Sequence, residues 1–123
     1  MFANSFSSHY IVKMLYRLLD EIKESKFNLL EIMHHYTSGM KAVFTQECND
    51  GLLAIRQSIG GAGYTNWSGI PSLIEDYSPQ ITFEGDNTVM AQQSANFLLK
   101  LTKKSLKGKE IIKEKPLNYI QNL

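Results

Sequence analysis

The first part of the sequence repeats apolar residues with the period of an α-helix. Between about Ser5 and Ser25 they recur three and four positions apart, as on one face of a helix. The charged side chains of this stretch fall mostly on the opposite face. We therefore predict an amphipathic helix over residues 5–25 whose apolar face packs against another element. Its apolar positions are Tyr10, Ile11, Met14, Leu15, Leu18, Leu19 and Ile22.

A second and longer helical pattern covers residues 29–59. Asn28, with Glu31 three positions later, is typical of a capping box at the start of a helix. Two glycines lie inside the pattern, and each costs about 1 kcal/mol relative to alanine in a helix. We therefore expect another helix to approach closely at Gly39 and Gly51. The apolar positions are Met33, Tyr36, Met40, Val43, Phe44, Cys48, Leu52, Ile55 and Ile59.

Three glycines end this second pattern. Gly60 suits the position after a helix C-terminus, and together with Gly61 and Gly63 it leaves the backbone open to close approach. Taken alone, a tight turn without a ligand is the simpler interpretation. The run is not a dinucleotide-binding fingerprint, because that motif follows a strand and opens a helix. We expect a structured glycine-rich loop over residues 60–83, in which Pro71 starts one short helical turn.

The last helical pattern covers residues 87–104, with Asp86 or Asn87 as a suitable N-cap. A chain of 123 residues forms one domain at most. We predict an all-α fold, a helical bundle of about three long helices over roughly 5–25, 29–59 and 87–104. The helical domain would occupy residues 1–104, and residues 105–123 would form a basic, flexible tail.

Composition narrows the class of protein without identifying a function. Hydrophobic residues make up 43% of the chain and charged residues 20%, as in ordinary folded domains. No apolar run approaches the roughly 18 residues needed to cross a bilayer, and the first ten residues do not resemble a secretory signal. The lone Cys48 excludes a disulfide framework and favours a reducing compartment. We expect no metal site, because the adjacent His34 and His35 diverge by about 100° on a helix.

The formal net charge of +1 hides an uneven distribution. Residues 1–99 carry six Lys and Arg against ten Asp and Glu, whereas residues 100–123 carry seven Lys against two Glu. A basic end can bind nucleic acid or anionic lipid. The lysines here are not interleaved with aromatic residues or arginine, so we expect a solvated tail and no nucleic-acid partner. These lysines are Lys103, Lys104, Lys107 and Lys109.

Glu84 is the candidate for chemistry. It follows the apolar residues Ile81 and Phe83 and precedes the polar start of a helix. Apolar surroundings favour proton uptake by a carboxylate, which a general base requires. The alternative is a helix-start carboxylate that only interacts favourably with the helix dipole.

The glycine turn and the Glu84 segment together resemble the peroxisomal acyl-CoA oxidases of the acyl-CoA dehydrogenase superfamily. The resemblance covers most of residues 5–101, and it corresponds to the first C-terminal helical domain of that family. It leaves the lysine-rich tail unmatched. The matching runs are TSGMKA from Thr37, RQSIGGAGY from Arg56, WSGIP from Trp67, TFEGDNTVM from Thr82 and QSANFLLK from Gln93.

The resemblance implies an FAD enzyme that introduces an α,β double bond into a fatty acyl-CoA during fatty acid β-oxidation. In that family a glutamate removes the α-proton, the flavin accepts the β-hydrogen as hydride, and O2 is reduced to H2O2. Glu84 matches the catalytic glutamate. The family further implies a homodimer in which one subunit's glycine turn approaches the FAD of its neighbour. The matching cofactor-binding positions are Gln57, Gly60 and Gly61 in the turn, and Gly85, Asp86 and Asn87 beside Glu84.

The chain departs from the family in two ways. Ala62 and Ile70 stand where many members have histidine and leucine, which weakens the expected contribution of the turn. Members are also several times longer and carry a flavin-binding β-domain, so we expect this chain alone to be inactive. Two alternatives stay open: a non-catalytic helical dimerisation or docking module, and a piece of an acyl-CoA dehydrogenase, in which E-G-T is usual where this chain has E-G-D.

The cellular location is implied by the family alone. Members are peroxisomal, whereas the last residues here, Gln121-Asn122-Leu123, share only the final leucine with the S-K-L peroxisomal signal. We expect a peroxisomal protein on the family resemblance, and a cytosolic one otherwise.

Overall fold

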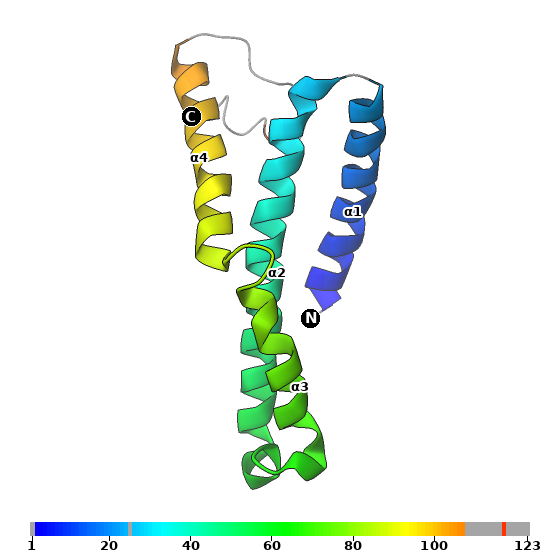
Figure 1. The fold of residues 1–123 in the computed structure, drawn as a ribbon, viewed down its shortest axis with the longest axis vertical. Helices are drawn as coiled ribbons and strands as arrows, with labels where there is room; N and C mark the ends of the chain where they lie inside the picture. Colours follow the sequence, from blue (N-terminus) through cyan, green and yellow to red (C-terminus); the bar gives the residue numbers. More distant parts are fainter. Residues whose placement is uncertain (1, 25, 108–116, 118–123) are drawn as a thin grey trace.

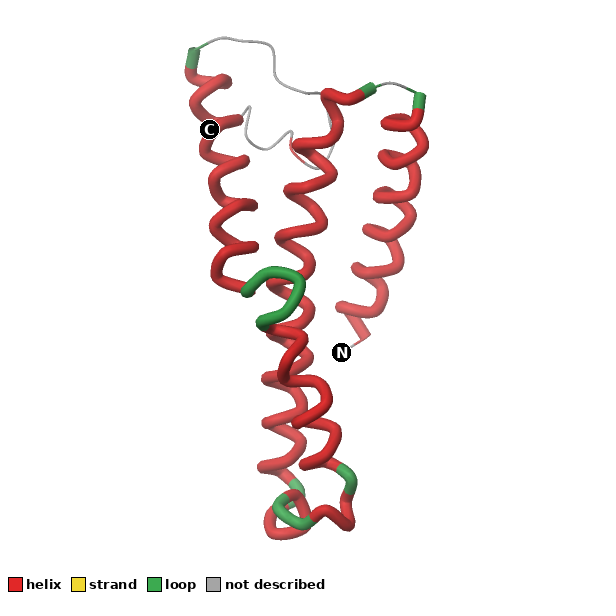
Figure 2. Tube along the Cα trace, viewed as in Figure 1, coloured by secondary structure: helices red, strands yellow, loops and turns green. Residues whose placement is uncertain are grey.

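The computed structural model describes residues 2–24, 26–107 and 117, and these residues form helices joined by turns (Figure 2). The part of the chain that it describes contains no strand. The long helices are α1 (Phe2–Lys23), α2 (Leu30–Ser58) and α4 (Asn87–Leu106), and the shorter α3 spans Ile70–Tyr77. Short 3₁₀ turns lie at Phe27–Leu29, Gly60–Gly63, Asn66–Ser68 and Ser78–Ile81. The prediction of an all-α fold with three long helices is confirmed.

The long helix α2 is the spine of the molecule (Figure 1). Its first half lies between α1 and α4, and its contact with α4 is the most extensive between any two elements. Its second half extends beyond both helices and packs against α3. The chain therefore has a three-helix end and a two-helix end, and α4 begins near the boundary between them.

The core lies at the three-helix end. Leu18 of α1 and Ile32 of α2 are fully buried there, and Phe97 and Leu101 of α4 complete the cluster. Leu117 is only 2% exposed and belongs to the same core. The rest of the predicted tail beyond Lys107 lies outside the described residues, and the predicted domain boundary stays a prediction.

The buried face of α1 is narrower than the apolar stripe in its sequence. Met14, Leu18 and Ile22 are buried, whereas Tyr10 is 70% exposed although it belongs to the same predicted stripe. The difference arises because α2 is the main helix packed against α1, and one neighbour covers only part of a wide stripe.

The structure corrects the predicted start of α2. This helix begins at Leu30 with Leu29 as its N-cap, and the cap side chain makes no hydrogen bond. Asn28 lies in the 3₁₀ turn before the helix, so α2 begins one residue later than predicted. The backbone N–H of Leu29 bonds to the Lys26 carbonyl at 3.1 Å, and the Leu29 side chain is buried in the core. The capping box itself stays a prediction.

The other helix ends follow local signals in the sequence. Gly60 has a left-handed φ of 60° directly after the end of α2, and Pro71 lies in the first turn of α3, as predicted. Asp86 caps α4, because its carboxylate accepts a hydrogen bond from the Thr88 N–H at 2.8 Å. Among the described helices, none is both long and apolar enough to span a membrane.

One of the two helical glycines has the expected packing role. A Cβ atom at Gly39 would lie 3.0 Å from the Ser94 hydroxyl oxygen, so α2 and α4 approach closely there. The reason for Gly51 stays a prediction.

Candidate functional site

Glu84 lies in the tight turn that connects the 3₁₀ turn Ser78–Ile81 to α4. The N–H groups of Thr82 and Phe83 both donate to the Pro79 carbonyl at 2.9 Å, which folds the chain back on itself. Glu84 follows with φ of 55°, and it is the only non-glycine residue with positive φ in the part of the chain that the structure describes. This conformation costs a residue with a side chain about 1–2 kcal/mol. The surrounding structure must therefore hold it in place.

Gly85 is one part of that support. Its φ is 107°, and a Cβ atom would lie 2.5 Å from the terminal methyl carbon of Met90. A side chain at this position would therefore collide with Met90, which packs over the turn from the start of α4. The Asp86 cap joins the turn to the helix that follows it.

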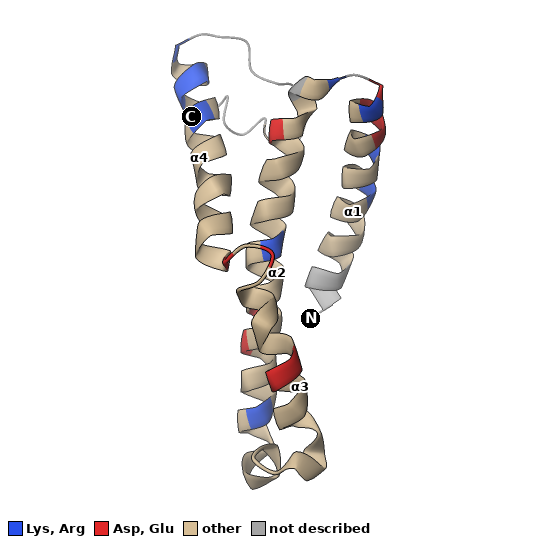
Figure 3. Ribbon diagram, in the orientation of Figure 1, with Lys and Arg blue, Asp and Glu red and all other residues tan. Residues whose placement is uncertain are grey.

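Lys41 of α2 is the second residue that supports the turn around Glu84. Its ammonium group donates to the Gly85 carbonyl at 2.6 Å and to the Asn87 side-chain oxygen at 2.7 Å. Asn87 in turn donates to the Thr45 hydroxyl at 3.0 Å. Hydrogen bonds from a charged donor contribute about 1.5–3 kcal/mol each, so two of them outweigh the cost of the Glu84 backbone. Figure 3 shows a basic segment near the middle of α2 beside the acidic loop that precedes α4.

The side chain of Glu84 is exposed, and the neighbouring Phe83 is 44% exposed. The apolar surroundings that the sequence predicts for this carboxylate are therefore not supplied by the described part of the chain. The residues before Glu84 form a turn at the surface, in which Ile81 is half-buried and Phe83 is exposed, and the role of Glu84 as a base stays a prediction. Any enclosure of Glu84 has to come from another polypeptide segment.

The glycine turn lies at the far tip of α2. Gln57, Gly60 and Gly61 are exposed there, and a Cβ atom at either glycine would meet nothing within 4 Å. Gly63 differs, because a Cβ atom there would collide with the Arg56 carbonyl oxygen. Packing within the chain therefore explains Gly63 and leaves Gly61 unexplained. The open backbone at Gly60 and Gly61 can be approached closely by a ligand.

The structure does not bring the two predicted groups of flavin-binding residues together. Asn87 is bonded to Thr45 of α2, and Gln57 lies twelve residues further along the same helix. At 1.5 Å per residue, the two groups are separated by about 18 Å along α2. Gly85, Asp86 and Asn87 do lie beside Glu84, as predicted from their sequence positions.

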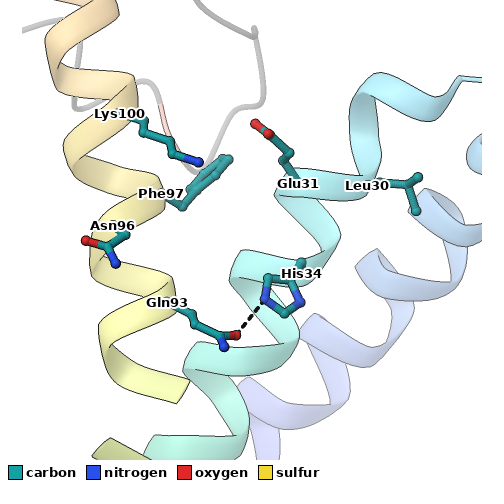
Figure 4. Close-up of a pocket in the computed structure, with 7 residues that line it drawn as sticks. All are labelled: Leu30, Glu31, His34, Gln93, Asn96, Phe97 and Lys100. Atoms are coloured by element: carbon teal, nitrogen blue, oxygen red, sulfur yellow. Dashed lines mark hydrogen bonds between the residues drawn. The ribbon is translucent and has the colours of Figure 1, made fainter. Parts of the chain in front are cut away.

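A separate groove of about 430 Å³ lies between α2 and α4 (Figure 4). The His34 ring nitrogen Nε2 lies 2.8 Å from the Gln93 side-chain oxygen across it. None of the predicted flavin-binding residues lines this groove. Its lining residues are Leu30, Glu31, His34, Gln93, Asn96, Phe97 and Lys100.

His35 joins the same two helices on the buried side. Its Nδ1 lies 2.9 Å from the Ser94 hydroxyl oxygen, and its ring stacks on Phe97 with 4.7 Å between centroids. Burial lowers the pKa of His35, and a hydrogen bond with the Ser94 backbone opposes this only in part. Among the described residues, no three His, Cys, Asp or Glu side chains lie close enough to hold a metal ion.

Sequence reasoning missed the role of Lys41. The residue lies in a run that supports the family resemblance, but its partners are 44 and 46 positions away in the sequence. A weak signal exists, since Lys41 and Thr45 are four positions apart and therefore share one face of the helix.

The helical fold and the F-E-G turn before α4 are those expected of an acyl-CoA oxidase helical domain, and a comparison with known protein families gives the same class. Residues 1–99 match the family model described as the acyl-CoA oxidase C-alpha1 domain. The chain therefore belongs to the acyl-CoA oxidase family, and the predicted family is confirmed.

Individual relatives give the same result. The chain is 37% identical over 108 residues to peroxisomal acyl-coenzyme A oxidase 1 of Mus musculus, covering 88% of this chain and 16% of that protein. It is 36% identical over 99 residues to the Homo sapiens protein of the same name, covering 80% of this chain and 15% of that protein. The chain thus spans about one sixth of the length of these relatives.

A solved structure shares the fold. The crystal structure of acyl-CoA oxidase-1 of Caenorhabditis elegans, complexed with FAD and ATP, matches with a TM-score of 0.85 and 30% sequence identity. The match covers 94% of this chain and 18% of that one. FAD is therefore bound by a member of the family whose fold this chain shares.

Proposed function

We propose that this chain supplies the base-bearing helical domain of an FAD-dependent acyl-CoA oxidase. The complete enzyme would convert a fatty acyl-CoA into its α,β-unsaturated product in β-oxidation and reduce O2 to H2O2. The family match over residues 1–99, with F-E-G-D-N at the start of α4, carries the proposal. The chain alone would be inactive, because it spans only about one sixth of its relatives.

Glu84 would act as the general base. Its carboxylate would take the proton from the carbon next to the thioester carbonyl, so that the C–H electron pair becomes available for the new double bond. FAD, when bound, supplies the acceptor for the hydride that leaves the β-carbon. The exposure of Glu84 supports this role, because the carboxylate is open to a substrate from outside the chain.

The cofactor-binding residues would contribute from two places. Gly85, Asp86 and Asn87 would lie against the flavin next to Glu84. Gln57, Gly60 and Gly61 would contact the FAD of the second subunit of a homodimer, and their distance from Glu84 along α2 supports this division. The residues present fit such a role as one edge of a site, since the glycine backbone is open. The relatives' names support a peroxisomal location for the complete enzyme.

A non-catalytic docking module is the second candidate. The complete exposure of Trp67 and the 83% exposure of Tyr64 favour a surface that another polypeptide covers. The support that holds Glu84 in a left-handed conformation favours the catalytic role, because docking alone requires no such turn.

The test is a graft of residues 1–99 in place of the matching segment of the Mus musculus relative. We expect the grafted enzyme to bind FAD and to release H2O2 from an acyl-CoA, and the 123-residue chain to release none. Glu84→Gln should lower kcat by about 10²–10⁴-fold while FAD content is unchanged. Glu24→Gln, at an exposed carboxylate just after α1, is the matched control.

Two results would contradict the proposal. Full activity of the Glu84→Gln graft would show that Glu84 is not the general base. Turnover that requires an electron-transfer flavoprotein and releases no H2O2 would indicate a dehydrogenase.

A further inference from the structure

The contacts of Lys41 are with the first and third residues after the proposed base. Its ammonium group bonds to the backbone carbonyl of Gly85 at 2.6 Å and to the side chain of Asn87 at 2.7 Å. Both acceptors are uncharged, so these bonds fix the position of the turn without neutralising a carboxylate. Lys41 is half-buried near the middle of α2, on a helix held by the core.

We propose that Lys41 is a positioning residue that orients Glu84 for proton abstraction. The proposal rests on the proposed function of Glu84. Lys41 acts on Glu84 through the Gly85 carbonyl and Asn87. By holding both, it prevents the turn from relaxing to an extended backbone, which would point the Glu84 carboxylate in another direction.

Thr45 and Met90 add to the support of the same turn. Thr45, one helical turn after Lys41, donates its hydroxyl to the Lys41 carbonyl at 2.7 Å and accepts a hydrogen bond from Asn87 at 3.0 Å. A Cβ atom at Gly85 would meet the end of the Met90 side chain. The residues that follow Glu84 are thus held from α2 through Lys41 and from α4 through the Asp86 cap, as a preorganised reactive group requires.

The first experiment needs no cofactor and uses the complete 123-residue chain. The strength of the intraresidue HN–Hα NOE of Glu84 reports a left-handed backbone. We expect this NOE to be strong in the wild-type chain and weak in Lys41→Met, while the signals of the core residues Leu18 and Ile32 keep their positions. Lys13→Met, which removes an exposed lysine of α1, should leave the Glu84 signal unchanged. An unchanged Glu84 signal in a folded Lys41→Met chain would overturn the proposal.

The second experiment uses the grafted enzyme. Lys41→Met should lower kcat about 10–100-fold with KM changed less than about threefold, because the substrate still binds but meets a misdirected base. A residue with a merely structural role would instead lower the amount of folded, FAD-loaded enzyme with kcat per flavin unchanged, and that result would overturn the proposal. If Lys41→Met fails to fold, Lys41→Arg keeps the charge but moves the donor atoms, and the same two readouts apply.

The outcomes separate this inference from the proposed function. A graft that binds FAD but has no activity with wild-type Lys41 and Glu84 contradicts the proposed function. The NMR comparison of the free chain still decides whether Lys41 holds the turn.

Discussion

The two ends of α2 differ in how much of their apolar surface is covered. At the three-helix end, Leu18 and Ile32 are fully buried among α1, α2 and α4. At the two-helix end, Trp67 is 100% exposed and Tyr64 is 83% exposed. Both ends have regular helices and turns, so order in the backbone does not require a core nearby.

The two-helix end obtains its shape from local signals instead. Gly60 and Gly69 adopt left-handed conformations, and Pro71 lies in the first turn of α3. Such residues fix the backbone of a turn but bury little apolar area. An exposed apolar surface of this kind is typical of one that another polypeptide covers. The exposed apolar residues at this end are Leu53, Ile55, Ile59, Tyr64, Trp67 and Leu73.

The largest effect is expected from a cavity at the three-helix end. Leu18→Ala should lower the free energy of unfolding by about 2–5 kcal/mol, because Leu18 is fully buried. The matched change at the other end, Leu53→Ala, should cost less than about 1 kcal/mol, because this side chain is already 40% exposed. Urea denaturation followed by circular dichroism measures both. Equal losses would show that the two ends are equally packed.

A comparison of glycines should give the next largest difference. Gly85→Ala should destabilise the chain by about 1–3 kcal/mol, because it introduces a Cβ at φ of 107° and against Met90. Gly61→Ala should change stability by less than about 0.5 kcal/mol, since a Cβ there meets nothing within 4 Å. Thermal denaturation checks both variants. A large loss at Gly61 would mean that this turn is constrained within the chain itself.

The pH dependence of stability tests the contact between α2 and α4. Because burial lowers the pKa of His35 in the folded state, the unfolded chain binds a proton first as the pH falls. The contribution of His35 to stability should therefore be complete above pH 6.5 and decrease as the pH falls below 6.5 towards the lowered pKa. His35→Gln should remove this part of the pH dependence in urea titrations between pH 5 and 8. A wild-type and variant pair with parallel pH profiles would contradict the predicted shift.

The smallest effect on stability is expected at Trp67. Trp67→Ala should change the free energy of unfolding by less than about 0.5 kcal/mol, because the side chain contributes no buried surface within the chain. The same variant should reduce self-association at high protein concentration, since it removes an exposed aromatic side chain. Denaturation and sedimentation measure the two effects separately. A clear loss of stability would show that Trp67 packs within the chain after all.

The sequence predicts the helices and helix ends that are determined by residues close to one another in the sequence. Helical periodicity predicts the three long helices, and Asp86, Gly60 and Pro71 predict helix ends through local backbone chemistry. The start of α2 at Leu30 lies one residue later than the sequence predicts, directly after the buried Leu29.

The candidate site is predictable to a smaller extent. The position of Glu84 and its neighbours follows from one short run, whereas the support from Lys41 requires knowledge of how α4 lies along α2. The exposure of Glu84 could not be predicted either, because apolar residues next to a carboxylate in the sequence need not pack against it in the structure.

The length of α2 has a further consequence, because a helix fixes both distance and direction. Twelve residues separate Thr45, which holds the Glu84 turn through Asn87, from Gln57 beside the glycine turn. This spacing equals three full helical turns plus about 120°. Deleting one residue between them would move the glycine turn by about 1.5 Å and rotate it by about 100°. The relative placement of the two groups is therefore quantised: it can change in steps of one residue, and each step turns the open glycine backbone towards a different side of the molecule.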